Sequence, residues 1–119
     1  MNQLKIKEKL LVESCEDYVG IWTIIWELRQ ESLENDELLI REKTVEILRY
    51  FLERKLIDIG NFDRDGEFVV WDLQSNQVIE RIESEWNQLE REPNIGDIAW
   101  FVATEKGEEI ATTFGSETE

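Results

Sequence analysis

The hydrophobic periodicity of this chain changes near residue 56, and that change limits which folds are open to it. Residues 56–62 and 67–71 are two short runs rich in β-branched and aromatic side chains, whereas the preceding apolar residues recur every three or four positions. Residues 63–66 between the runs read Asp-Arg-Asp-Gly, and an Asp-Gly turn in this setting is typical of a β-hairpin. The chain is therefore predicted to combine helices with a hairpin, which is an α+β fold.

Three amphipathic segments predict the main helices. In each of them apolar residues lie on one face at helical spacing, and polar residues suited to helix ends stand beside them. The predicted ranges are residues 15–30, 35–55 and 76–91.

Polar side chains mark the expected start of each helix. Ser14-x-x-Asp17 is a candidate capping box for the first helix. Asp36 suits the N-terminus of the second, and Ser75 that of the third. We also expect a break near Ile40-Arg41, which would divide the second helix into a short and a long part.

The remaining chain predicts one more strand and a short terminal helix. Residues 98–102 are apolar and aromatic, as expected of a strand, and residues 104–111 follow as a turn into a helix. At 119 residues, with a single proline and no Gly/Ser-rich linker, the chain is expected to be one domain over residues 1–114. Residues 115–119 read as a disordered polar tail.

Two segments resemble winged helix-turn-helix domains. Residues 44–57, Thr-Val-Glu-Ile-Leu-Arg-Tyr-Phe-Leu-Glu-Arg-Lys-Leu-Ile, are similar to the end of a recognition helix running into the first strand of the wing. Residues 100–107, ending in Thr-x-x-Gly, are similar to the close of many such domains. The resemblance covers residues 16–71 and 97–111, and implies three main helices with a hairpin and a further strand. The predicted helix 76–91 is an insertion in the wing of such a domain. In this respect the chain is similar to small uncharacterised bacterial proteins.

The charge argues against the DNA binding that this resemblance implies. The chain carries 28 acidic and 13 basic residues, a formal net charge of −15. Residues 60–97, the expected wing and its inserted helix, hold ten acidic and three basic residues, a net charge of −7. Affinity for nucleic acid depends mainly on Lys and Arg that neutralise phosphates. We therefore expect no nucleic-acid partner.

One segment matches much of a calcium-binding EF-hand loop. Asn61, Asp63 and Asp65 stand at alternate positions, Gly66 follows, and Asp72 occupies the twelfth position. However, the first position is normally Asp and the last Glu, and the flanking residues predict strands rather than helices. A bulged hairpin whose aspartates stabilise the turn is the favoured interpretation, so no metal is expected, and a calcium-responsive module is the lesser alternative.

The composition excludes several kinds of enzyme. The chain has no histidine, which excludes His-based general bases, Ser-His-Asp and Cys-His nucleophile systems, and His-ligated zinc. No Gly-rich phosphate loop is present, and the acidic pairs are explained by solvated helix faces. Cys15, the single cysteine, lies among acidic residues and is expected to be partly buried and inert. No catalytic residue and no cofactor are therefore predicted.

Five tryptophans are many for a chain of this length. Trp22 and Trp86 are expected in the core, whereas Trp26 and Trp71 are displaced from the main apolar faces and are candidates for a partly exposed patch. With these two tryptophans we group the carboxylates of the predicted turn. The candidate interaction residues are Trp26, Trp71, Asp63, Asp65 and Glu67.

The sequence favours a small acidic, non-enzymatic protein-interaction module, either binding a basic partner or forming a homodimer. The first alternative is an acidic immunity protein, antitoxin or DNA mimic that blocks a basic nuclease or DNA-binding protein, and the second is a winged-helix transcriptional regulator. No secretory signal precedes the first charged residues, and the most apolar stretch, residues 21–26, is far shorter than the roughly 20 residues that span a bilayer. A cytoplasmic location without membrane contact is expected.

Overall fold

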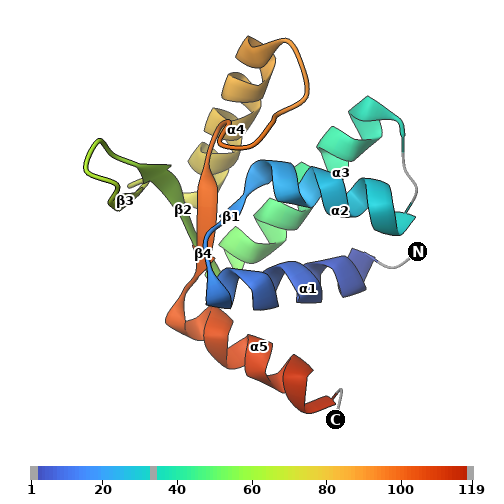
Figure 1. Ribbon diagram of the computed structural model, residues 1–119, viewed down its shortest axis with the longest axis vertical. Coiled ribbons are helices and arrows are strands. Elements are labelled where there is room, and N and C mark those ends of the chain that lie inside the picture. The colour runs from blue at the N-terminus through green and yellow to red at the C-terminus, as the bar shows by residue number, and fades with distance from the viewer. Residues whose placement is uncertain (1–2, 33–34, 118–119) are drawn as a thin grey trace.

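A computed structural model describes residues 3–32 and 35–117 of the chain. Over these residues it contains five helices and four strands (Figure 1), which confirms the predicted α+β class. In chain order they are α1 (Gln3–Glu16), β1 (Val19–Gly20), α2 (Ile21–Ser32), α3 (Glu37–Glu53), β2 (Ile57–Phe62), β3 (Phe68–Val70), α4 (Ser75–Leu89), β4 (Trp100–Ala103) and α5 (Glu105–Glu117).

The strands form one antiparallel sheet in the order β1-β4-β2-β3. β2 and β3 are the two arms of the predicted hairpin, with Gly60 opposite Val70 and Phe62 opposite Phe68. β4 comes after α4 in the chain, yet lies between β1 and β2 and pairs with both. The hairpin is confirmed, and Figure 1 shows it extending away from α1, α2 and α3.

Apolar side chains from the five helices and the sheet make one core. Phe51 of α3 and Phe101 of β4 are buried, with ring centroids 6.2 Å apart. Leu10 of α1, Ile24 of α2 and Ile82 of α4 are also fully buried. Removal of this apolar surface from water is the main favourable term in folding. Because these helices cover the face of the sheet that bears Phe101, the side chains of the opposite face stay nearer to solvent.

The prediction of a single helix over residues 15–30 is wrong at its first end. α1 continues to Glu16, β1 intervenes, and α2 begins only at Ile21, whose N–H donates to Ala99 O at 3.3 Å. The structure therefore has an additional N-terminal helix, α1, before the three main helices that the sequence predicts.

Ser14 is not the helix cap that the sequence suggested. It is buried within α1, and its Oγ donates to Leu11 O at 2.7 Å, which satisfies the hydroxyl without exposing it. Asp17 accepts the N–H of the next residue, Tyr18, through Oδ1 at 2.7 Å. The expected Ser14-x-x-Asp17 box is replaced by the turn that leads into β1.

α3 is a single continuous helix, so the expected break at Ile40-Arg41 is wrong. Ile40 is fully buried, and its carbonyl accepts the Thr44 hydroxyl at 2.8 Å. The predicted role of Asp36 is confirmed, because its Oδ1 accepts backbone N–H groups of the first turn at 3.0 and 3.2 Å.

The later elements differ from prediction by a few residues. Gln74, rather than Ser75, is the N-cap of α4. Ile98 has a positive φ of 68°, so β4 begins two residues later than expected. α5 is longer than the predicted short helix, and the expected tail, residues 115–119, lies partly outside the described residues. Within 3–32 and 35–117, no helix has the length and apolar character needed to cross a membrane.

Candidate interaction surface

The tip of the β2–β3 hairpin is an acidic turn, which we define as Asp63, Asp65 and Glu67. Asp63 Oδ1 accepts the backbone N–H groups of Asp65 and Glu67, both at 2.9 Å. Gly66 has a φ of 82°, a conformation that favours glycine. Asp63 thus shapes the turn as predicted, while all three carboxylate-bearing residues remain exposed.

Asn61 does not join these carboxylates. Its Oδ1 accepts the indole N–H of Trp71 at 2.7 Å, and its Nδ2 donates to Ile98 O at 2.8 Å. Asp72 is exposed beyond the end of β3. In the described part of the chain, no group of three or more acidic or cysteine side chains is arranged to hold a metal ion. The EF-hand-like spacing therefore serves a hairpin here, with its first candidate ligand engaged elsewhere.

The two tryptophans proposed for an exposed patch have different environments. Trp26 is 50% exposed, as expected. Trp71 is only 8% exposed, so its predicted exposure is wrong. Its indole is held by Asn61 and covered by the guanidinium of Arg81, 3.8 Å from the ring centroid. Trp71 therefore belongs to the packing of α4 against the hairpin.

Four aromatic side chains gather on the face of the sheet opposite the core. We call Tyr18, Phe62, Phe68 and Trp100 the aromatic face. Tyr18 lies 4.9 Å from Phe62 and 4.7 Å from Phe68 between ring centroids, and Phe62 lies 5.8 Å from Trp100. Edge and tilted ring contacts of this kind are favourable beyond simple burial. Tyr18 and Phe62 are nevertheless 38% and 39% exposed, so the cluster is only partly covered.

Glycines flank Trp100 in the sheet. Gly20 of β1 and Gly60 of β2 lie opposite Trp100 on the two neighbouring strands. A Cβ on Gly20 would be 3.7 Å from the Trp100 ring and 2.6 Å from the side chain of Trp22. The contact with Trp100 would be an ordinary one, so the absence of a side chain at Gly20 accommodates Trp22 rather than Trp100.

The aromatic face borders the acidic turn directly. Phe62 precedes Asp63, and Phe68 follows Glu67, so carboxylates stand at one end of the ring cluster. The sequence predicts this turn but not the cluster of rings, because Tyr18 falls within the predicted helix 15–30. Successive residues of a strand point to opposite faces of the sheet. This alternation places Asp58, Gly60 and Phe62 on the face opposite Ile57, Ile59 and Asn61, and it is the signal in the sequence that Phe62 faces away from the core.

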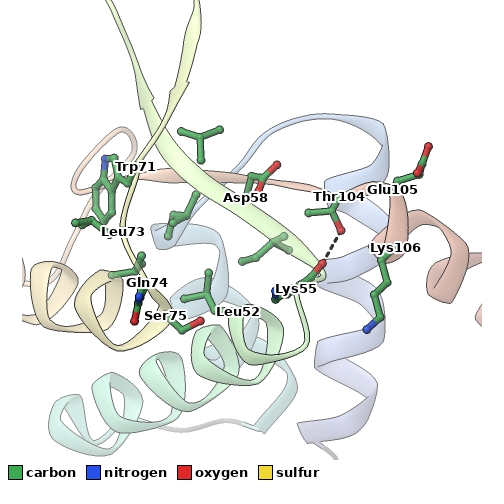
Figure 2. Close-up of a pocket in the computed structure, with 14 residues that line it drawn as sticks. Leu52, Lys55, Asp58, Trp71, Leu73, Gln74, Ser75, Thr104, Glu105 and Lys106 are labelled. Atoms are coloured by element: carbon green, nitrogen blue, oxygen red, sulfur yellow. Dashed lines mark hydrogen bonds between the residues drawn. The ribbon is translucent and has the colours of Figure 1, made fainter.

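A groove of about 760 Å³ adjoins the hairpin, because Val70 of β3 and Trp71 are among the residues that line it (Figure 2). It runs between the end of α3, β2, the start of α4 and the start of α5. Lys55 and Lys106 stand on its border together with Asp58 and Glu105, and the Thr104 hydroxyl donates to Lys55 O at 2.7 Å. The two lysines and the two carboxylates give this border no formal net charge.

Three cations on or near α3 make contacts within the fold. Arg41 donates to Glu83 O at 3.2 Å and lies 3.5 Å from the carboxylate of the same residue. Arg54 stacks on Tyr50 at 3.9 Å, and Lys7 lies over the same ring at 4.0 Å. Arg49 of α3 and Arg54 at its C-cap nevertheless remain exposed.

Cys15 lies in a half-buried position at the end of α1. Its Sγ donates to Leu11 O at 3.3 Å. Burial raises the pKa of the Cys15 thiol, and the carboxylates of Glu108 and Glu16 raise it further. Because the thiolate is the reactive form, this environment favours an inert cysteine, as the sequence suggested.

The surface thus offers aromatic rings and carboxylates, and this combination suits recognition of an apolar and basic partner. Comparisons with protein families, with curated proteins and with solved structures found no match to this chain.

Proposed function

We propose that this chain is a non-enzymatic protein–protein interaction module on a winged-helix-like scaffold. The support for the scaffold is the position of β4 between β1 and β2, next to the consecutive helices α1, α2 and α3. β3 and α4 then form an insertion between the two long strands of the wing.

The observation that carries the proposal is the exposed aromatic face beside the acidic turn. Tyr18 and Phe62 keep more than a third of their surface in water although each contacts other rings. Covering such side chains with a partner removes apolar surface from water, and aromatic residues are enriched at interface hot spots. Isolated exposed apolar residues are common, whereas a contiguous cluster of rings favours a binding surface.

The charge favours a basic partner over a second copy or a nucleic acid. Two copies of a chain with a net charge of −15 repel each other, as do the chain and a phosphate backbone. A basic protein would be attracted to the acidic turn, which speeds association at low salt.

Affinity capture tests the proposal. The immobilised full chain should retain one basic protein from native lysate at low salt and release it at about 0.5 M NaCl, where charges are screened within a few ångströms. Phe62→Ser should abolish retention, because it removes the centre of the aromatic face. Leu38→Ser, a change at an exposed apolar residue of α3, should leave retention intact.

Two results would contradict the proposal. One is equal capture by the wild type and Phe62→Ser when both give the same thermal melt. The other is a homodimer, seen by sedimentation velocity, that accounts for all binding to the aromatic face.

The exposed carboxylates of the hairpin favour a sharper second candidate, an inhibitor of a basic nuclease or DNA-binding protein. Asp63, Asp65, Glu67 and Asp72 are all exposed along one short hairpin. If the captured partner binds nucleic acid, addition of this chain should displace the nucleic acid in a competition assay. The double variant Asp63→Asn/Glu67→Gln should displace the nucleic acid less well than the wild type does. Its thermal melt should change little by comparison.

A further inference from the structure

β3 has one edge that no described strand covers. It is the last strand in the sheet order and pairs with β2 alone. Figure 1 shows the hairpin standing clear of the helices on that side. An uncovered strand edge offers backbone donors and acceptors to another chain, which natural proteins usually avoid unless the edge is used.

The hydrogen-bond pattern identifies which backbone groups point outward. The Asp63 N–H donates to Glu67 O, and the Trp71 N–H donates to Ile59 O, both at 2.9 Å. In an antiparallel pair, hydrogen-bonded and non-hydrogen-bonded positions alternate. The backbone N–H and C=O groups of residues 67, 69 and 71 therefore point toward β2. Those of Phe68 and Val70 point toward the open edge.

The same two residues connect this edge to the aromatic face. Phe68 lies opposite Phe62 and is itself a member of the aromatic face. Val70 lies opposite Gly60, shares that side of the sheet, and is 46% exposed. A strand added beside β3 would thus place every second side chain next to the exposed rings.

Carboxylates stand at both ends of this edge. The acidic turn precedes Phe68, and Asp72 follows Trp71. Of the nearby arginines, Arg81 is engaged with Glu85 at 2.8 Å and with the ring of Trp71, which leaves Arg64 within the turn. An added strand with Lys or Arg side chains would pair with the carboxylates, and a guanidinium would also stack on the rings.

We propose that the open edge of β3 binds an extended, Lys- or Arg-containing segment of a partner protein by strand addition. The segment makes main-chain hydrogen bonds with Phe68 and Val70, and its alternate side chains cover the aromatic face. A second copy is the wrong occupant, because it would bring an equally acidic hairpin to the same edge. The inference rests on the proposed interaction function and specifies its geometry.

Fluorescence anisotropy with synthetic peptides tests the geometry. The probe is a labelled peptide of alternating Arg and Val, and the control peptide carries Glu in place of each Arg. Only the Arg–Val peptide should bind the full-length chain. Val70→Pro should weaken binding at least about tenfold, since proline removes an outward N–H but no bond to β2. Val70→Thr, which keeps that N–H, should change the affinity by less than about threefold.

Amide exchange measured by NMR gives an independent readout. The Arg–Val peptide should slow exchange at Phe68 and Val70, and should leave Leu38 on α3 unchanged. Equal binding by Val70→Pro and the wild type, or binding without this protection, would overturn strand addition.

The outcomes separate this inference from the broader function. If Val70→Pro still captures the lysate partner while Phe62→Ser does not, the aromatic face is an interface and the edge is not. Failure of the Arg–Val peptide to bind at low salt would also overturn the basic-segment inference. Self-association with protection of Phe68 and Val70 would overturn it in favour of a second copy.

Discussion

The ionised form of Glu13 is less favourable in the folded protein than in the unfolded chain. Glu13 lies on α1 near the Lys9–Glu27 ion pair, in which Lys9 Nζ and Glu27 Oε2 are 3.1 Å apart. Burial raises the pKa of Glu13 above its ordinary value of 4.5, and the Glu27 carboxylate raises it further. A carboxyl whose pKa is higher in the folded state favours folding at low pH. That contribution is lost as the pH rises through the folded-state pKa, because the ionised group is then less stable in the fold.

Glu13→Gln should therefore stabilise the protein at neutral pH. The residue is partly exposed, so solvent screening limits the gain in unfolding free energy to about 0.5 kcal/mol. The gain should disappear below about pH 4, where the wild-type side chain is protonated in both states. Urea unfolding at a series of pH values measures this, with Glu8→Gln on the same helix as the control. A gain that persists at low pH would contradict the role assigned to burial.

Gly60 is required by the close approach of β3. A Cβ at this position would overlap the carbonyl oxygen of Val69 and lie 2.9 Å from Val70 Cα. Both contacts are with backbone, which cannot rotate away as a side chain can. Gly60→Ala should cost about 3 kcal/mol of unfolding free energy.

Gly66→Ala provides the matched control for this prediction. Nothing lies within 4 Å of a Cβ at Gly66, but its φ of 82° disfavours alanine. This change should cost about 1 kcal/mol. Chemical denaturation of both variants compares them, and a smaller loss for Gly60→Ala than for Gly66→Ala would show that the hairpin tolerates the contact.

At the scale of the element, the hairpin and α1 show what the sequence can predict. The hairpin depends on local signals, namely two β-rich runs and an Asp-Gly turn, and it forms as predicted. α1 was missed because Lys5, Lys7 and Lys9 alternate with other residues and conceal a narrow apolar face. That face, Ile6 and Leu10 among its members, is evident only once α2 and β4 pack against it.

The aromatic face could not be predicted from local patterns. Its members come from the segment before β1, from both arms of the hairpin and from β4, which are up to 82 residues apart. β1 has two residues, too few to give a periodic signal, yet its pairing with β4 helps to position Tyr18. Long-range strand pairing therefore decides this surface, and only its acidic border was visible in the sequence.

Lys55, just after the C-terminal end of α3, has a strained backbone conformation. Lys55 adopts a left-handed φ of 60°, and the next residue, Leu56, donates its N–H to Phe51 O at 2.9 Å. Glycine is the usual residue at this position of a helix end. Lys55→Gly should raise the unfolding free energy by about 1 kcal/mol, because it removes the cost of a left-handed non-glycine residue. The bond from Thr104 to the backbone carbonyl of residue 55 is retained.

Glu53→Gly is the control for that prediction. It places glycine within the last turn of α3 and should lower stability by about 1 kcal/mol. Thermal melts of the two variants should shift in opposite directions. A loss of stability in Lys55→Gly would mean that the lysine side chain contributes more at the border of the groove than its backbone strain costs.

At the scale of the whole molecule, the net charge is distributed unevenly. α4 and the hairpin from Gly60 onward lie within residues 60–97, which hold ten acidic and three basic residues, whereas residues 1–30 carry five acidic and four basic residues. The carboxylates of this acidic segment repel one another. Burial of Ile82 and Trp86 on the inner side of α4 stabilises the fold against that repulsion. Electrostatic repulsion is therefore concentrated where α4 and the hairpin project from the core.

This distribution predicts that added salt stabilises the protein. It also predicts that reversing the charge of one carboxylate in the acidic segment gives part of the same stabilisation. Added NaCl screens repulsion between exposed carboxylates, so the Tm should rise between about 0.01 and 0.5 M NaCl. Glu80→Lys, on the exposed side of α4, should raise the unfolding free energy by about 0.5 kcal/mol at low salt and by almost nothing at high salt. Glu8→Lys, within the nearly balanced residues 1–30, should give a smaller change at low salt. A Tm that falls with NaCl, or equal gains for the two reversals, would show that charge repulsion is not concentrated in the acidic segment.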